Sequence, residues 1–236
     1  MEGENAYSSL QYLCSNNIKN QPGSITYTQM LNSNGGIEAD LSITCISEKK
    51  YRIVTGSAVR EHDKKHILKH LDKSINFRDI TEKYVCFGIF GPKSRDLLTE
   101  IFGKEFESNK FPFGYAKSLE IKNINILFQR LSFVGELGWE LYIPINDSKK
   151  IYELIINAGK NYGLVHAGRL AMDIMRMEKG YLHWGHDISP EENPYEANLG
   201  FTVKLNKKYD FIGKAKLQEV KDTPKKQFVM LTLVDF

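Results

Sequence analysis

The sequence has few cysteines and no long apolar run, and both absences narrow the classes of protein that it can encode. Its three cysteines are far apart and include no C-x-x-C pair, which argues against a disulfide framework and a zinc site. No stretch approaches the roughly 18 apolar residues of a membrane span, and the first residues lack the basic and apolar parts of a signal peptide. This pattern predicts a reducing compartment, with the cytoplasm expected first and the mitochondrial matrix as the alternative.

The charge balance is close to even, and several catalytic signatures are missing. The 236 residues include 32 Lys and Arg against 29 Asp and Glu, a net charge of +3, so we expect neither nucleic acid nor a membrane as a partner. No G-x-S-x-G, Walker loop, G-x-G-x-x-G or H-E-x-x-H motif occurs. Any chemistry would therefore depend on carboxylates and a bound ligand. The length suits one large domain or two small ones.

One carboxylate stands on the best-defined hairpin of the sequence. Residues 25–31 (ITYTQML) are rich in aromatic, β-branched and apolar side chains, and residues 34–36 (NGG) are typical of a tight turn. Residues 37–44 (IEADLSIT) alternate apolar and polar positions, which predicts a second strand with Asp40 on its polar face. A rigid strand suits a binding or catalytic group, although the exposed face of an ordinary sheet shows the same alternation.

The predicted elements occur twice in the same order. A helix follows Gly3 and another follows Gly91, and each is followed by a hairpin, a strand and a further helix. The later strand and helix are predicted at residues 49–56 and 57–71 in the first half, and at residues 140–146 and 147–159 in the second. We therefore predict an α+β fold of two related halves with antiparallel sheets. A strand at residues 84–90 precedes Gly91 and has no full counterpart before Gly3.

Residues 131–144 (LSFVGELGWELYIP) combine aromatic and acidic side chains. Phe133, Trp139 and Tyr142 are predicted beside Glu140, where flat rings and a carboxylate would suit a heteroaromatic ligand that offers N–H groups. A hairpin whose second strand begins at Trp139 explains the glycines of this segment without a ligand. Both interpretations stay open from the pattern alone.

Histidines form two clusters, and neither predicts a metal site. The first is His62, His66 and His70, and the second is His183 and His186 with Asp187. Three ligands on one straight helix cannot easily surround an ion, so the first cluster favours a solvated helix flank. The second cluster has no further ligand at a suitable spacing.

Four segments together resemble a known family. In chain order they are TYTQMLNSNGGIEADL, FGIFGPKSRDLL, FVGELGWELYIP and MRMEKGYLHWGHDISPEENPYEANLGF. They are similar to the folate-binding region of the aminomethyltransferase (glycine cleavage T-protein) superfamily, with a particular likeness to the C-terminal half of sarcosine and dimethylglycine dehydrogenases. The resemblance covers nearly all of the chain. It implies α+β domains around a central channel, followed by a small β-barrel.

The resemblance also implies domain boundaries. A folate-binding aminomethyltransferase-like domain is expected at residues 1–220, short of its first strand, and the start of a truncated C-terminal barrel at residues 221–236. The β-prone residues 225–236 (KKQFVMLTLVDF) are expected to form the strand that opens this barrel. The FAD-binding half that the dehydrogenases carry upstream is expected only in a missing domain.

The resemblance assigns roles to individual residues. In this family the Asp after the hairpin, here Asp40, lies near the reactive nitrogens of tetrahydrofolate, which implies that it is the catalytic residue. Glu140 matches the acidic residue that holds the pterin edge. The other folate-binding residues implied are Tyr27, Phe133, Arg176 and Trp184, and no metal is implied. Phe133 stands where the family usually has Tyr, which removes one hydroxyl contact.

The implied activity is the capture of a one-carbon unit as 5,10-methylenetetrahydrofolate. That unit is an iminium or formaldehyde from the demethylation of sarcosine or dimethylglycine, and the implied partner is an FAD oxidase domain or subunit. One alternative is a T-protein-like aminomethyltransferase or folate-dependent demethylase acting alone, which Met172 weakens because T-proteins commonly have Arg there. The other alternative is a non-catalytic folate-binding or assembly module, against which the presence of Asp40 argues.

Overall fold

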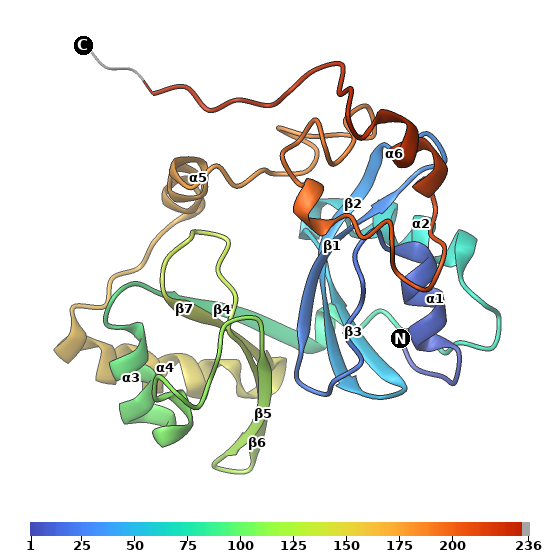
Figure 1. Ribbon diagram of the computed structural model, residues 1–236. Helices are drawn as coiled ribbons and strands as arrows, with labels where there is room; N and C mark the ends of the chain where they lie inside the picture. Colours follow the sequence, from blue (N-terminus) through green and yellow to red (C-terminus); the bar gives the residue numbers. More distant parts are fainter. Residues whose placement is uncertain (233–236) are drawn as a thin grey trace. The chain divides into compact units, whose positions relative to one another are not determined.

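The computed structural model describes residues 1–232, which form two compact units (Figure 1). The first unit contains Met1–Phe77 and the chain from Leu182 onward, and the second unit is Arg78–Tyr181. The second unit is thus inserted between two segments of the first. No helix within residues 1–232 is long and apolar enough to cross a membrane.

The first unit is built on a three-stranded antiparallel sheet. Its strands are β1 (Ile25–Leu31), β2 (Ile37–Ser47) and β3 (Lys50–Val54), in the order β1-β2-β3. One face packs against α1 (Ala6–Leu13) and α2 (Arg60–His70), which follows the short 3₁₀ segment η1 (Ser57–Val59). Ala39, Leu41 and Ile43 alternate along β2 and are buried in this core, as the period of two predicts. The polar positions between them lie on the opposite face.

The turn between β1 and β2 is fixed by a side chain and by a distant loop. The Asn32 side-chain oxygen accepts hydrogen bonds from the backbone N–H groups of Asn34 (2.9 Å) and Gly36 (3.0 Å). A Cβ atom on Gly36 would lie 1.8 Å from the carbonyl oxygen of Pro190, so this position requires glycine. The backbone N–H of Ile37 also donates to the Glu192 carbonyl (2.9 Å). The register of the hairpin is therefore anchored at its turn.

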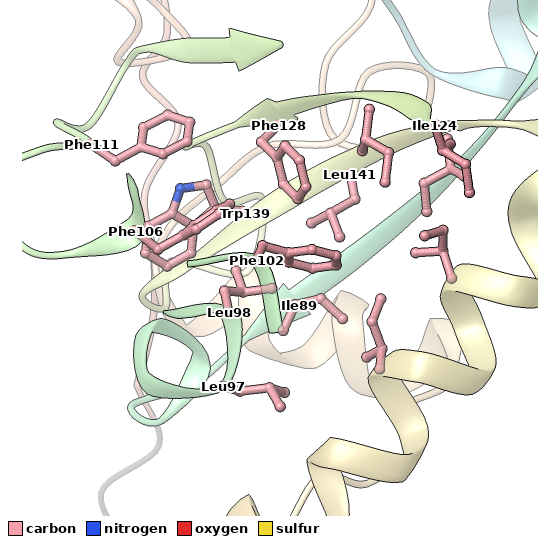
Figure 2. Packing of buried hydrophobic residues seen from close by; sticks show 14 residues of the cluster. Ile89, Leu97, Leu98, Phe102, Phe106, Phe111, Ile124, Phe128, Trp139 and Leu141 are labelled. Atoms are coloured by element: carbon pink, nitrogen blue, oxygen red, sulfur yellow. The ribbon is translucent and has the colours of Figure 1, made fainter. Parts of the chain in front are cut away.

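The second unit has a four-stranded antiparallel sheet and a core rich in aromatic side chains. Its strands are β4 (Tyr84–Phe90), β5 (Ala116–Ile121), β6 (Ile124–Gln129) and β7 (Gly138–Pro144), in the order β4-β7-β6-β5. The helices α3 (Ser94–Phe102) and α4 (Ser148–Gly159) pack against it. Figure 2 shows the rings of Phe102, Phe106, Phe111, Phe128 and Trp139 gathered between the sheet and α3.

The two units share one topology, which confirms the predicted α+β fold of two related halves. In the second unit β4 lies beside β7, and Gly91 leads from β4 into α3. In the first unit the Tyr51 N–H donates to the Met1 carbonyl (2.9 Å) and the Gly3 N–H to the Lys49 carbonyl (3.0 Å). Met1 and its neighbour therefore pair with β3 as β4 pairs with β7, and Gly3 then leads into α1. The central channel implied by the resemblance stays a prediction.

The remaining described elements connect and follow these sheets. They are α5 (Arg169–Glu178) in the second unit, and η6 (Gly200–Thr202) and α6 (Lys214–Val220) in the first. The strand predicted at residues 225–236 is wrong over residues 225–232, which form no strand, and residues 233–236 lie outside the described part of the chain. Instead of joining a sheet, the Phe228 N–H donates to the Glu196 carbonyl (2.8 Å), and the Phe228 carbonyl accepts from the Asn198 side chain (2.6 Å). Loop contacts thus satisfy the backbone there.

Candidate functional site

Asp40 lies on the polar face of the first sheet, opposite Gln29 on β1. The register pairs Gln29 with Asp40 and Tyr27 with Ser42, so these side chains share the face that α1 and α2 do not cover. The Gln29 side-chain N–H donates to Asp40 Oδ1 at 2.8 Å, and Tyr27 also hydrogen-bonds to this carboxylate. The structure therefore brings the predicted residues Tyr27 and Asp40 together.

The surroundings of Asp40 change its acidity. Burial raises the pKa of Asp40 from 3.8 to about 6, while the hydrogen bonds from Gln29 and Tyr27 lower it, and the nearby carboxylate of Asp63 raises it. Desolvation is the largest of these effects, because a charged carboxylate loses hydration when the protein covers it. A carboxyl group with a pKa near neutrality can both accept and release a proton under physiological conditions.

This raised pKa predicts that Asp40→Asn stabilises the chain at alkaline pH. The folded-state pKa lies above the unfolded-state value, so stability from protonated Asp40 is fully present below about pH 4 and is lost as the pH rises through 6. We expect Asp40→Asn to raise the free energy of unfolding by roughly 1–3 kcal/mol at pH 8 and by little at pH 4. Urea titrations at both pH values measure this difference.

The matched control for this measurement is Asp210→Asn, because Asp210 is an exposed carboxylate of the same unit. Its substitution should leave the free energy of unfolding within about 0.5 kcal/mol at both pH values. A lower stability of Asp40→Asn than of the unmodified chain at pH 8 would show that the ionised carboxylate stabilises the fold, contrary to this account.

Trp184 is held against the start of β2. Its indole N–H donates to the Ile37 carbonyl (2.7 Å), and its ring lies 5.0 Å, centroid to centroid, from that of His62. His62 in turn contacts Glu38 (3.3 Å) and the buried Asp63 (3.0 Å). His62 therefore does not lie on a merely solvated flank, and it links two carboxylates near Asp40. The alternation that places Glu38 on the face of Asp40 was the only sequence signal for this network.

In the second unit Glu140 occupies the middle of β7. The register places it opposite Gln129 on β6 and Gly88 on β4. The Tyr142 hydroxyl donates to Glu140 Oε2 at 2.7 Å. Burial raises the pKa of Glu140, and this hydrogen bond lowers it. Glu140 is a half-buried carboxylate on a rigid strand, as the sequence predicts.

The aromatic surface near Glu140 differs from the prediction. Trp139 is adjacent in sequence, so the strand alternation turns it to the opposite face, where it is fully buried in the core (Figure 2). The expectation that Trp139 lies beside Glu140 is therefore wrong, whereas Tyr142 does lie there. A Cβ atom on Gly88 would lie 2.4 Å from the Phe90 ring, so Phe90 covers the position opposite Glu140. The sequence interpretation missed Phe90, because only the register reveals it.

Two other predicted residues also lie in the second unit. Arg176 is buried near the end of α5, where its guanidinium donates to Asp173 (2.7 Å) and to the Tyr181 carbonyl (3.0 Å). Phe133 is half-buried in the loop between β6 and β7. Their folate-binding roles stay predictions. Arg176 already has a structural role, since it ties α5 to the segment that follows.

Among the described residues, no group of three or more His, Cys, Asp or Glu side chains is placed to hold a metal ion. In the second histidine cluster His186 contacts the Asp187 carboxylate (2.9 Å), which also accepts from the backbone N–H of His183 (2.9 Å). These contacts order the loop that carries Trp184.

A duplicated α+β fold with a half-buried carboxylate on a strand of each unit defines the class of this protein. The description of the GCVT N-terminal domain matches residues 1–207, and the chain belongs to this family. It is an aminomethyltransferase-type domain related to sarcosine and dimethylglycine dehydrogenases, in a family whose aminomethyltransferases use tetrahydrofolate. The resemblance inferred from the four sequence segments is thereby confirmed.

Individual relatives support the same assignment. The chain is 35% identical over 233 residues to mitochondrial sarcosine dehydrogenase of Homo sapiens, covering 92% of this chain and 25% of the relative. It is 34% identical over 237 residues to mitochondrial dimethylglycine dehydrogenase of Homo sapiens, covering 99% and 27%. The chain thus spans about a quarter of the length of these curated relatives.

The fold itself matches a solved structure. The crystal structure of glycine cleavage system aminomethyltransferase T from Bartonella henselae superposes with a TM-score of 0.80 and 22% identity, covering 94% of this chain and 60% of that chain. This likeness supports the architecture.

Proposed function

We propose that the chain binds tetrahydrofolate and captures a one-carbon unit at the oxidation level of formaldehyde, giving 5,10-methylenetetrahydrofolate. The observation that carries this proposal is Asp40, a carboxyl group on a rigid strand whose pKa burial raises to about 6. Such a group can take up and release a proton near neutral pH. The 35% identity to a sarcosine dehydrogenase supports the one-carbon chemistry.

The residues present fit a reduced folate. A carboxylate accepts hydrogen bonds from the paired N–H groups of a pterin edge, and Glu140 is a half-buried carboxylate oriented by the Tyr142 hydroxyl (2.7 Å). The Phe90 ring near Glu140 offers an apolar surface for a flat heterocycle. Tyr27, Phe133, Arg176 and Trp184 are the further residues proposed for folate binding.

Tetrahydrofolate, when bound, supplies the amine nitrogens that accept the one-carbon unit. Asp40 would orient the reacting amine, stabilise positive charge beside it and take up the proton that the amine loses. Gln29 and Tyr27 hold the carboxylate in place during these events. The carboxylate must be ionised to act as the base, so transfer is expected to increase as the pH rises through 6.

The source of the one-carbon unit is proposed from the relatives. We propose that the domain works beside an FAD-dependent amine oxidase domain or subunit that demethylates sarcosine or dimethylglycine. The proposed domain boundaries are residues 1–220 for folate binding and 221–236 for the start of the following barrel. The compartment, the cytoplasm or alternatively the mitochondrial matrix, would be that of the amine oxidase.

Calorimetric titration with tetrahydrofolate tests the binding part of this proposal. We expect Glu140→Gln to weaken binding by about tenfold or more, because an ionised acceptor to the ring edge is lost. The control is Glu153→Gln, which removes a more exposed carboxylate of the same unit and should bind as the unmodified chain does. Absence of tetrahydrofolate binding by the unmodified chain would favour an assembly module. Equal affinity in both variants would remove Glu140 from the site.

A further inference from the structure

Two buried polar side chains lie behind Asp40, and the proposed chemistry does not use either directly. Gln29 on β1 and Thr202 at the end of η6 are both fully buried. The Thr202 hydroxyl contacts the Gln29 side-chain oxygen, and the Gln29 side-chain nitrogen lies 2.8 Å from Asp40 Oδ1. Although 173 positions separate Gln29 from Thr202 in the sequence, they form a continuous chain of contacts to the carboxylate.

The chemistry of the three groups fixes the direction of this chain. An ionised carboxylate only accepts hydrogen bonds, so Gln29 must present its amide N–H to Asp40. The amide oxygen then faces Thr202, whose hydroxyl can donate to it. A second acceptor, the Leu199 carbonyl, lies 2.6 Å from the same hydroxyl. The threonine therefore stays paired whichever way its single proton points.

We propose that Thr202 and Gln29 are positioning residues for Asp40, with the threonine hydroxyl holding the glutamine amide in the orientation that aims its N–H at the carboxylate. The importance of this arrangement for turnover rests on the proposed function of Asp40. Both side chains are buried, and a buried amide without a fixed partner can turn over and present its oxygen instead. Two oxygen acceptors would then face each other, which disfavours the ionised carboxylate.

Other charged and titratable groups face Asp40 and stay in place when Thr202 changes. They are Tyr27 on β1, Glu38 on β2, and His62 and Asp63 on α2. A change in the titration of Asp40 on substitution of Thr202 would therefore report on the Gln29 amide. Loss of the N–H donor must shift this titration towards higher pH, because a hydrogen bond to the charged form favours that form.

The test compares Thr202→Val, which removes the hydroxyl at similar volume, with Thr202→Ser, which retains it. The control is Thr26→Val, another nearly buried threonine, whose side chain lies on the opposite face of β1 and accepts from the Lys19 N–H (3.2 Å). The Asp40 carboxyl is titrated by ¹³C NMR without folate. Formation of methylenetetrahydrofolate from tetrahydrofolate and formaldehyde is then measured across the pH range.

In Thr202→Val we expect the midpoint of the Asp40 titration and the acidic limb of the kcat profile to move together to higher pH. The kcat at pH 6.5 should fall about tenfold and recover at alkaline pH, with KM for tetrahydrofolate within twofold of the unmodified value. Thr202→Ser and Thr26→Val should keep the original midpoint. If Thr202→Val does not fold, Gln29→Met removes the same N–H donor and should give the same shift.

An unchanged Asp40 midpoint in Thr202→Val, or in Gln29→Met where that variant is used, would overturn the positioning role. An equal shift in Thr26→Val would overturn it as well, because the effect would then be general to buried threonines. If the unmodified chain forms no methylenetetrahydrofolate, the proposed function fails, and the NMR midpoints still decide the positioning role by themselves.

Discussion

Asp40→Asn is expected to lower kcat for one-carbon transfer to tetrahydrofolate by a factor of about 10²–10⁴, the usual contribution of a positioned acid–base group. Asparagine has nearly the same shape and keeps a hydrogen-bond acceptor for Gln29, but it cannot take up the proton that the amine loses. Affinity for tetrahydrofolate should change by only a few-fold. A coupled assay with formaldehyde as the one-carbon donor measures kcat, and calorimetry measures the affinity.

This loss would not reflect unfolding, because the same substitution is expected to stabilise the fold above pH 6. A gain in stability together with a loss of turnover is characteristic of a functional group kept in an unfavourable environment. Asp210→Asn, in an exposed position of the same unit, should leave both quantities unchanged. Full activity in Asp40→Asn would remove the carboxylate from the chemistry, and a matching loss in Asp210→Asn would indicate general damage.

Trp139→Ala is expected to lower the free energy of unfolding of the second unit by about 3–5 kcal/mol. The indole is fully buried, lies 5.6 Å from the Phe106 ring and 5.9 Å from the Phe111 ring between centroids, and has the Arg95 and Arg130 guanidinium groups over its face. Truncation leaves a cavity that this crowded core can fill only in part. Urea unfolding followed by circular dichroism measures the loss.

Trp139→Phe separates packing from hydrogen bonding. Within the described residues, the Trp139 indole N–H is buried without a hydrogen-bond partner, so this variant loses volume and no bond, and should cost about 1–2 kcal/mol. Phe113→Ala is the control, because Phe113 is 69% exposed in the same unit and should change stability by under about 0.5 kcal/mol. A cost in Trp139→Ala no larger than in Phe113→Ala would contradict the assignment of Trp139 to the core.

Local patterns predicted most of the secondary structure. The turn at residues 34–36 and the alternation after it gave β1 and β2 with Asp40 on the polar face, because these features depend on near neighbours. The repeat of helix, hairpin, strand and helix gave the α+β class of two related halves. The helix predicted at residues 57–71 is in fact a 3₁₀ segment followed by α2, a difference within the ordinary uncertainty of helix ends.

Features that depend on register or on distant segments were not predictable in the same way. Trp139 was expected beside Glu140 because sequence proximity was given more weight than the alternation of a strand. Thr202 contacts Gln29 across 173 positions, and no local pattern signals such a contact. The β-prone run at residues 225–232 forms no strand because its propensity depends on a neighbouring strand to pair with, and its backbone bonds to a loop instead.

The most direct test is a crystal structure of the chain with a stable reduced folate, such as 5-formyltetrahydrofolate. The central claim is that one folate molecule contacts both half-buried carboxylates. The account predicts the Glu140 carboxylate within hydrogen-bond distance of the N–H groups at the pterin edge, and the Asp40 carboxylate beside the nitrogens that carry the one-carbon unit. A folate bound elsewhere, in contact with neither carboxylate, would contradict it.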